Sequence, residues 1–261
     1  MKKAFKGIIA GIVIFMLCFC SLYVKAADRY YYQLKVYHFK TPAQADRIEH
    51  YLQYAYIPAM HKLGVKNVGV FKPVDTDTAD RKIYVLTPFG TWNELENAPQ
   101  KLLKDEQYLT AGKEYLDASY KDLPYNRIET IVLRAFPGMP EPAMPNLTAS
   151  KPDRVYELRS YENPTEKYHV SKLKMFNEGG EITLFKKLNF NAVFYAEVLA
   201  GGRTPNLMYL TTYNSRPDRD AHWKLFNDAP EWKTLRSLDE YQNNVSHVDD
   251  IFLHPAAYSD Y

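Results

Sequence analysis

Two stretches of the chain alternate apolar and polar residues in the same way, 124 positions apart. They are Tyr32–Tyr37, with the sequence YQLKVY, and Tyr156–Tyr161, with the sequence YELRSY. A period of two residues predicts β-strands that bury one face against a core. Because the signal recurs at a fixed distance, it predicts two copies of one structural unit.

Helix-start signals follow both strands. Thr41–Gln44 and Asn163–Glu166 each combine an N-cap residue, a proline in the first turn and a Gln or Glu that can reach back to the cap. Gly64 and Asn189 end the helical patterns, and these two residue types best tolerate the left-handed conformation at a helix end. We therefore expect a helical segment in each copy.

The rest of each copy predicts two strands, a second helix and a last strand. Thr91 with Glu94, and Ser215 with Asp218, mark the starts of the second helices. The order is β-α-β-β-α-β twice, which is the ferredoxin-like unit. The further strands are expected at about 67–71, 82–86 and 128–136 in the first copy, and at 192–196, 207–211 and 248–254 in the second.

The two copies are joined by residues 137–152, which hold five prolines and cannot continue a helix or a central strand. We expect modules at 27–136 and 154–261, with a largely extended linker at 137–153. Each four-stranded sheet carries helices on one face, so its other face must be covered. Two such sheets can cover each other and close, which removes their edges. The predicted fold is α+β: tandem ferredoxin-like modules that form a dimeric α/β-barrel within one chain.

The alternation along the first strand of each module assigns its residues to two faces. We expect Leu34, Val36, Tyr156 and Leu158 to meet the helices, although the inverted assignment fits the same short patterns. Charged groups would then point into the barrel, where an ion is costly to bury unless it is paired. The charges either pair with one another or form a polar pocket for a ligand. The candidate ligand-binding residues on this face are Lys35, Tyr37, Glu157, Arg159 and Tyr161.

Residues 213–232 concentrate aromatic and charged side chains after a predicted strand. Aspartates in the first turn of a helix suit its dipole, and Trp223 and Phe226 can share one face. The segment Asp228–Trp232 breaks this helix and starts another. Capping, docking and a helix break therefore explain most of the segment. His222 and Trp223 join the candidate ligand-binding residues, with a surface or capping role as the alternative for His222.

The first 26 residues predict a secretory signal. Lys2, Lys3 and Lys6 precede a short apolar run, and Ala26 lies at a suitable cleavage position. A single membrane anchor is the alternative, but the apolar run is shorter than the roughly 20 residues that a span needs. We expect export to the periplasm or the extracellular space.

Removal of this signal changes the chemistry available to the chain. Both cysteines and four lysines leave with it, so 29 Lys and Arg stand against 31 Asp and Glu. The resulting net charge of about −2 argues against nucleic acid or an anionic membrane surface as a partner. The mature chain has no thiol for catalysis or cross-linking, and we expect no stable membrane insertion.

Motifs for cofactors, metals and known catalytic mechanisms are missing from the sequence. It has no Gly-rich phosphate loop, no His-Glu-x-x-His and no Gly-x-Ser-x-Gly. Ala200–Pro205 holds two glycines, but its place between two predicted strands indicates a hairpin loop. His247, Asp249, Asp250 and His254 cluster near the C-terminus. On a strand His247 and Asp249 share a face, but two ligands are too few to specify a metal. We expect no cofactor and no metal.

Five segments of the second half carry a family resemblance: VYELRSY at 155–161, YNSRPDR at 213–219, DAPEW at 228–232, IFLHP at 251–255 and YS at 258–259. Through these segments the second half resembles the NIPSNAP family, a branch of the dimeric α/β-barrel superfamily. The first half resembles a diverged copy, with TPFGTW at 87–92 in place of the Tyr-x-Ser turn. The resemblance implies a fold more than an activity, because family members are generally without an established reaction or agreed catalytic residues. Wider relatives include cofactor-independent oxygenases, haem-degrading enzymes and lyases, but a fold does not transfer their functions.

Two kinds of function remain open on this basis. The first is an exported, non-catalytic tandem barrel that binds a small ligand or a protein partner, which the missing motifs and the diverged first half favour. The second is a cofactor-independent oxygenase or lyase-type enzyme that acts in a barrel or helix–sheet cleft, which the charges on Lys35, Glu157 and Arg159 favour. Two fused modules can satisfy each other as a monomer with pseudo-twofold symmetry, and exposed barrel sides also permit a homodimer.

Overall fold

The chain folds twice in the order strand, helix, strand, strand, helix, strand. A computed structural model describes residues 28–75 and 77–261, so the predicted signal lies outside the described residues. The first half contains β1 (Tyr31–Phe39), α1 (Pro42–Tyr51), a π-helical turn (Leu52–Tyr56), α2 (Ile57–Lys62), β2 (Gly69–Pro73), β3 (Arg81–Phe89), α3 (Trp92–Leu102), α4 (Glu106–Ala111), α5 (Lys113–Leu116) and β4 (Arg127–Ala135). The second half contains β5 (Val155–Glu162), α6 (Glu166–Asn177), α7 (Glu181–Lys187), β6 (Phe194–Ala200), β7 (Asn206–Tyr213), α8 (Arg216–Asp228), α9 (Pro230–Leu235) and β8 (His247–Pro255), with short 3-10 turns at Lys151–Asp153 and Asp239–Tyr241.

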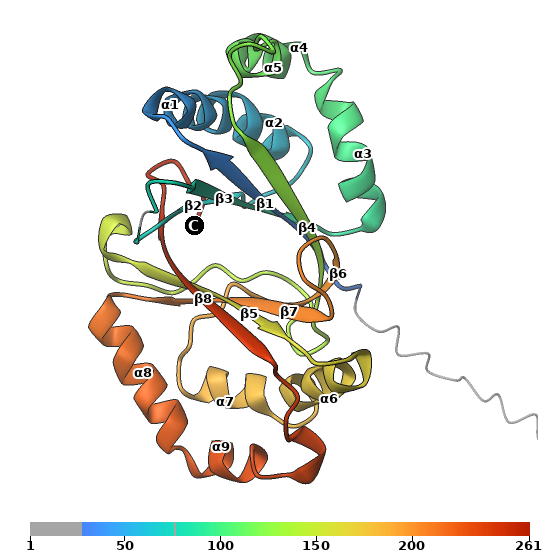
Figure 1. Ribbon diagram of the computed structural model, residues 1–261, viewed down its shortest axis with the longest axis vertical. Helices are drawn as coiled ribbons and strands as arrows, with labels where there is room; N and C mark the ends of the chain where they lie inside the picture. The colour runs from blue at the N-terminus through green and yellow to red at the C-terminus, as the bar shows by residue number, and fades with distance from the viewer. Residues whose placement is uncertain (1–27, 76) are drawn as a thin grey trace, which may run out of the picture.

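The eight strands close into one antiparallel barrel in the order β1-β3-β2-β8-β5-β7-β6-β4. The halves join at two seams, where Phe71 of β2 pairs with Pro255 of β8 and Ala135 of β4 pairs with Ala196 of β6. Figure 1 shows the helices of the first half on one side of the barrel and those of the second half on the opposite side. The predicted tandem α/β-barrel is confirmed, and its closure leaves no sheet edge unpaired among the described strands.

The barrel interior is apolar and is filled from both halves. Its side chains form one buried cluster that seals the two sheets against each other. The expected assignment of the strand faces is therefore wrong, because the residues expected to meet the helices lie in this interior: Leu34, Val36, Tyr156 and Leu158.

The opposite strand faces pack beneath the helices in two further cores, one for each half. Tyr37 belongs to the first of these cores and Tyr161 to the second. Alternation separates the two faces of a strand correctly, but it cannot identify them when helices cover one face and the second sheet covers the other. The charged candidates consequently lie under the helices and not in the barrel.

Local signals predict most of the helix ends correctly. Thr41–Gln44 and Thr91–Glu94 each form a reciprocal capping box, and Ser215 caps α8 by accepting a hydrogen bond from the backbone of the third helical residue. Gly64 and Asn189 have φ angles of 91° and 58°, as expected for residues that end a helix in the left-handed region.

The predicted cap at Asn163 is wrong. Thr165 is the N-cap of α6 and makes no side-chain capping bond. The side-chain nitrogen of Asn163 instead donates to the backbone carbonyl of Asn244 at 2.5 Å, and its side-chain oxygen lies 2.7 Å from Nδ1 of His169. These longer-range partners hold Asn163 outside the helix.

The segment between the halves runs along the barrel and bonds to it. The Tyr30 amide donates to the Pro140 carbonyl at 2.8 Å, and the Ala143 amide donates to the Val193 carbonyl at 3.0 Å. The side chain of Asn214 accepts from two backbone amides at 148 and 149. These bonds give extended backbone the partners that a sheet would otherwise supply.

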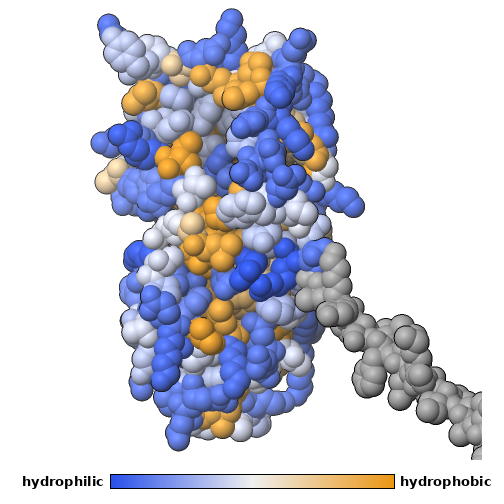
Figure 2. All heavy atoms as spheres, turned by 90° about the vertical axis from the view of Figure 1, so that its right-hand side faces the viewer, coloured by the Kyte–Doolittle hydropathy of each residue, from blue (hydrophilic) through white to orange (hydrophobic). Residues whose placement is uncertain are grey.

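Hydrophobic residues on the surface form several separate groups among hydrophilic ones, as Figure 2 shows for one side of the molecule. Scattered exposure of this kind is normal for a folded domain. Within residues 28–75 and 77–261, every helix is too short or too polar to cross a membrane.

Candidate functional site

A buried carboxylate, Glu157 on β5, organises the charges beneath α8, and its side chain is fully buried. Glu157 accepts hydrogen bonds from Arg159 at 2.7 Å, from Nε of Arg219 at 3.0 Å and from the Trp223 indole at 2.7 Å. Asp250 on β8 accepts from the same two arginines at 3.1 Å and 3.3 Å. Two carboxylates and two guanidinium groups thus neutralise one another, as a buried charge requires.

The pKa values of the two carboxyls in this network are shifted in opposite directions. Burial alone would raise the pKa of Glu157, but the hydrogen bond from Arg219 and the charges of both arginines hold it below its ordinary value. Burial and the nearby charge of Glu157 raise the pKa of Asp250 to about 6. Asp250 is therefore the carboxyl of the network that can exchange a proton near neutral pH.

A second buried ion pair lies deeper under the helices. Lys172 of α6 and Glu181 of α7 are 2.9 Å apart, with side chains that are 4% and 3% exposed. Burial raises the pKa of Glu181 although Lys172 opposes the shift. Between this pair and the first network, the hydroxyls of Tyr161 and Tyr209 lie 2.7 Å apart, and Arg159 donates to the Tyr161 oxygen at 3.1 Å.

A cleft of about 270 Å³ lies between β5, β8 and the helices of the second half. Aromatic rings form much of its wall, and the Lys172–Glu181 pair supplies its buried charges. Apolar walls with a few fixed polar groups are typical of sites for small ligands. Among the predicted candidates, Tyr161 and Trp223 line this cleft. The other lining residues are Met175, Phe226, Trp232, Arg236, Tyr241, Asn244, Val245 and Val248.

His222 has a local role in α8. Its Nδ1 lies 2.8 Å from the Asp218 carbonyl and 3.3 Å from the Asp218 carboxylate. Its ring packs against Phe190 and Tyr213, each at 5.7 Å between ring centroids. His222 lies on the flank of the charge network and does not line the cleft.

Lys35 and Tyr37 lie on the far side of the barrel from the other candidates. Lys35 lines a separate cleft of about 200 Å³ beneath α3. Tyr37 is only 2% exposed and packs edge-on against the rings of Tyr115 and Tyr125. The seven predicted residues therefore form two groups, one under each set of helices, and not one pocket.

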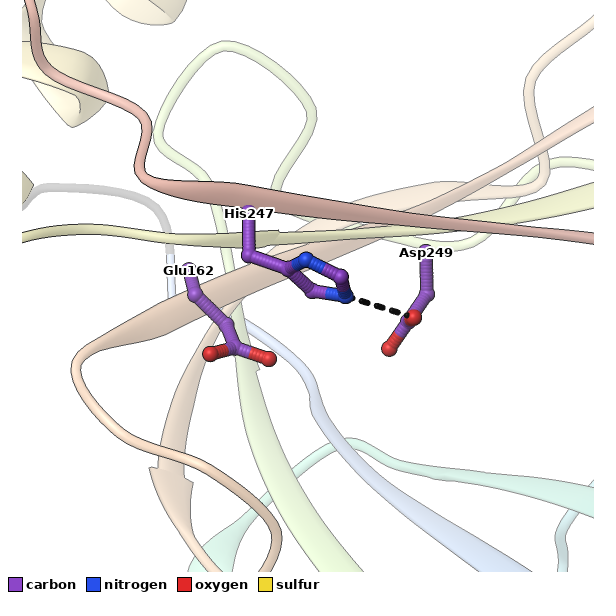
Figure 3. Close-up of side chains that lie close together, drawn as sticks. All are labelled: Glu162, His247 and Asp249. Atoms are coloured by element: carbon purple, nitrogen blue, oxygen red, sulfur yellow. Dashed lines mark hydrogen bonds and ion pairs between the residues drawn. The ribbon is translucent and has the colours of Figure 1, made fainter.

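The His and Asp residues near the C-terminus do not form one group in the structure. Figure 3 shows Glu162, His247 and Asp249 side by side, with His247 Nε2 bonded to Asp249 at 3.0 Å. One ligand atom from each of the three lies within 4.8 Å of the others, which makes them the one such group in the described part of the chain. Arg203 already pairs with both carboxylates, so a cation would have to displace its guanidinium group. His254 bonds elsewhere, to the Arg154 carbonyl.

Sequence reasoning missed four residues of the second-half site: Lys172, Glu181, Arg219 and Asp250. The sequence around Arg219 indicates a capped helix start, and Asp250 lies among possible metal ligands near the C-terminus, so neither residue by itself points to a charge network. Lys172 could have been found from the sequence. A lysine at a core-facing position of a helix indicates that a buried carboxylate pairs with it, here Glu181. The identity of that acid depends on how α6 and α7 pack.

Comparison with known proteins finds similar folds for the whole chain and a family match for its second half. No curated protein matches the chain. A candidate monooxygenase from Lactobacillus acidophilus NCFM matches 87% of this chain and 94% of its own, at 12% identity and a TM-score of 0.52. A candidate monooxygenase from Fusobacterium nucleatum subsp. nucleatum ATCC 25586 matches 87% of this chain and 92% of its own, at 9% identity and a TM-score of 0.52. At these identities the two likenesses show the fold alone.

The family match covers the second half. A NIPSNAP family protein from Agrobacterium tumefaciens str. C58 aligns with 41% of this chain and 90% of its own, at 18% identity and a TM-score of 0.37. Residues 156–260 match the NIPSNAP family. They include β5, the helices above the 270 Å³ cleft and β8. Residues 156–260, the part of the chain that is similar to the NIPSNAP family, lie in the second module of a dimeric α/β-barrel built within one chain.

Proposed function

We propose that this protein is an exported, non-catalytic binding protein whose NIPSNAP-like second module holds a small apolar or aromatic ligand. One observation carries the proposal: the 270 Å³ cleft, whose wall includes Tyr161, Trp223, Phe226 and Trp232. Aromatic side chains offer a ligand large contact areas at fixed positions.

The charges around the cleft support binding more than catalysis. Glu157 has three donors, and each neighbouring arginine has a carboxylate partner. Such a network fixes the position of α8 on β5, which is a structural role. A general acid or base would instead need a group that faces the ligand with its proton free to move.

The experiment uses 1-naphthol as an aromatic probe and tryptophan fluorescence as the signal. Trp92 lies in the first half, so Trp92→Phe leaves the two cleft tryptophans as reporters. In that background, Val248→Phe fills the cleft from its rim, where Val248 is 42% exposed. The matched control is Val170→Phe, because Val170 is 64% exposed and lies outside the cleft.

We expect saturable quenching by 1-naphthol that weakens at least about tenfold in Val248→Phe and does not change in Val170→Phe. Absence of saturable quenching, or equal binding by both valine variants, would refute the proposed site. Native mass spectrometry of the purified protein provides a second readout, since a resident ligand adds its mass to the chain. The same spectrum tests export, because removal of residues 1–26 lowers the mass of the chain.

The second candidate is a cofactor-independent oxygenase or lyase-type enzyme that acts at the charge network beside this cleft, where the Asp250 side chain is 29% exposed. Asp250 favours it, because a carboxyl with a pKa of about 6 can serve as a base near neutral pH. If 1-naphthol and O2 are converted with the protein into a naphthoquinone and water, so that the substrate gains one oxygen atom and loses two hydrogen atoms, and Asp250→Asn abolishes the product, the protein is an enzyme. Unchanged 1-naphthol supports the binding role.

A further inference from the structure

The first-half cleft beneath α3 is a diverged version of the second-half site. The strands β1 and β5, and the helices α3 and α8, correspond at a spacing of 124 residues, so Lys35 stands where the second half has Arg159. The strand residue opposite Lys35 on β4 is Thr130, whereas the residue opposite Arg159 on β8 is Asp250. The other partners are also replaced: Glu157 by Gln33, Arg219 by Leu95 and Trp223 by Pro99.

These replacements leave Lys35 without the carboxylates that pair with Arg159 in the second half. Within residues 28–75 and 77–261, no carboxylate lies within ion-pair distance of Lys35, and its ammonium nitrogen lies over the Tyr56 ring, 5.5 Å from the centroid. Burial lowers the pKa of Lys35, which is the response of an ammonium group that is removed from water without a counter-charge. An anion in the cleft would remove this cost.

The cleft around Lys35 is small and mainly apolar. It has a volume of about 200 Å³, and Phe89, Leu95 and Leu102 contribute to its walls. All three phenols on these walls already have a hydrogen-bond partner, because Tyr51 bonds to Tyr108 at 2.9 Å and Tyr56 bonds to Thr87 at 3.0 Å. Gln33 lines the cleft beside Lys35, and no hydrogen bond of its side chain appears among the described residues. Lys35 and Gln33 are therefore the polar side chains of this cleft for which the described residues provide no hydrogen-bond partner.

We propose that this cleft binds a small monocarboxylate with an apolar or aromatic body. The carboxylate pairs with Nζ of Lys35 and accepts from the amide of Gln33, while the body lies among the apolar walls. A single cation matches a single negative charge, whereas a phosphate would bring a second negative charge, and Lys35 is the one cation among the described residues that lines the cleft. The site is separate from the second-half cleft and does not rest on the function proposed for it.

The alternative is that Lys35 is structural, with its methylene chain covering Tyr56 and its charge resting on the ring. The two roles differ in their dependence on ligand charge. A structural lysine supports the walls of the cleft, so its loss weakens charged and neutral ligands alike. A lysine that pairs with a carboxylate distinguishes between them.

The experiment compares benzoate with benzamide, which has nearly the same shape but no charge. Calorimetric titrations are made on the wild-type protein, on Lys35→Met and on the control Lys40→Met, whose lysine is exposed just beyond the end of the same strand. The variant Lys35→Gln replaces Lys35→Met if the latter does not fold, because it removes the charge and keeps a polar end. Val248→Phe is included to exclude binding in the second-half cleft.

We expect saturable binding of benzoate that weakens at least about tenfold in Lys35→Met and does not change in Lys40→Met or Val248→Phe. Benzamide should bind weakly and change less than about twofold in Lys35→Met. The proposal is overturned if the wild-type protein does not bind benzoate, if Lys35→Met binds it equally well, or if both probes weaken together. Because Val248→Phe blocks only the second-half cleft, failure here and failure of 1-naphthol binding are distinguishable.

Discussion

The substitution Glu157→Gln tests the central role of the buried charge network. It keeps the shape of the side chain and its ability to accept from Trp223, but it removes the negative charge shared by Arg159 and Arg219. Those two side chains are only 14% and 16% exposed, so water cannot fully replace the lost partner. Removing one partner of a buried ion pair typically costs about 3–5 kcal/mol of stability.

Asp250 reduces this cost, because it already bonds to both arginines. We therefore expect the lower end of the range, about 3 kcal/mol, and a melting temperature lower by about 6–12 °C for a domain of this size. The pKa of Glu157 is lowered in the folded state, so its contribution is present above its unfolded value and is lost as the pH falls through the folded value. The difference between the wild-type protein and the variant should accordingly shrink in acid.

Urea unfolding followed by circular dichroism measures the effect. The control is Glu162→Gln on the same strand, since Glu162 pairs with the 60% exposed Arg203 and such a pair contributes about 0–1 kcal/mol. Replacing Arg159 by methionine in the Glu157→Gln background should recover part of the loss, because Arg219 and Asp250 then remain as a pair. A loss no larger than that of Glu162→Gln would refute the reasoning.

Two other substitutions test the raised pKa of Asp250 and the burial of Leu158 in the barrel. The folded state raises the pKa of Asp250 to about 6 and so holds its proton more tightly than the unfolded chain does. The stability of the wild-type protein relative to Asp250→Asn should therefore fall as the pH rises from about 4 to about 6. A difference in urea unfolding that stays constant over this pH range would contradict the expectation. Leu158→Ala should cost about 2–5 kcal/mol because Leu158 is 4% exposed inside the barrel, while Val170→Ala on the surface should change stability by less than about 0.5 kcal/mol. Equal losses in denaturant unfolding would contradict the burial of Leu158 in the barrel core.

The repeat and the order of its elements could be predicted from the sequence because their causes are local. Alternation at Tyr32–Tyr37 and Tyr156–Tyr161 specifies strands, and the capping boxes at Thr41–Gln44 and Thr91–Glu94 specify helix starts within four residues. Closure into a barrel also followed, since two sheets with one bare face each must cover those faces. These features depend on backbone geometry and on apolar spacing, which the sequence states directly.

The partners of the charged side chains were decided by the tertiary structure. Lys35 and Arg159 occupy equivalent places in the repeat, yet Arg159 meets Asp250 and Lys35 meets Thr130, each from a strand about 90 residues further along the chain. The sequence also left the faces of the strands undecided. Both faces are covered, so alternation does not show which of them points into the barrel. The sequence by itself determined which elements form and that they form twice. Only packing decided which charges are neutralised, because Coulomb interactions and desolvation depend on distances between residues far apart in the chain.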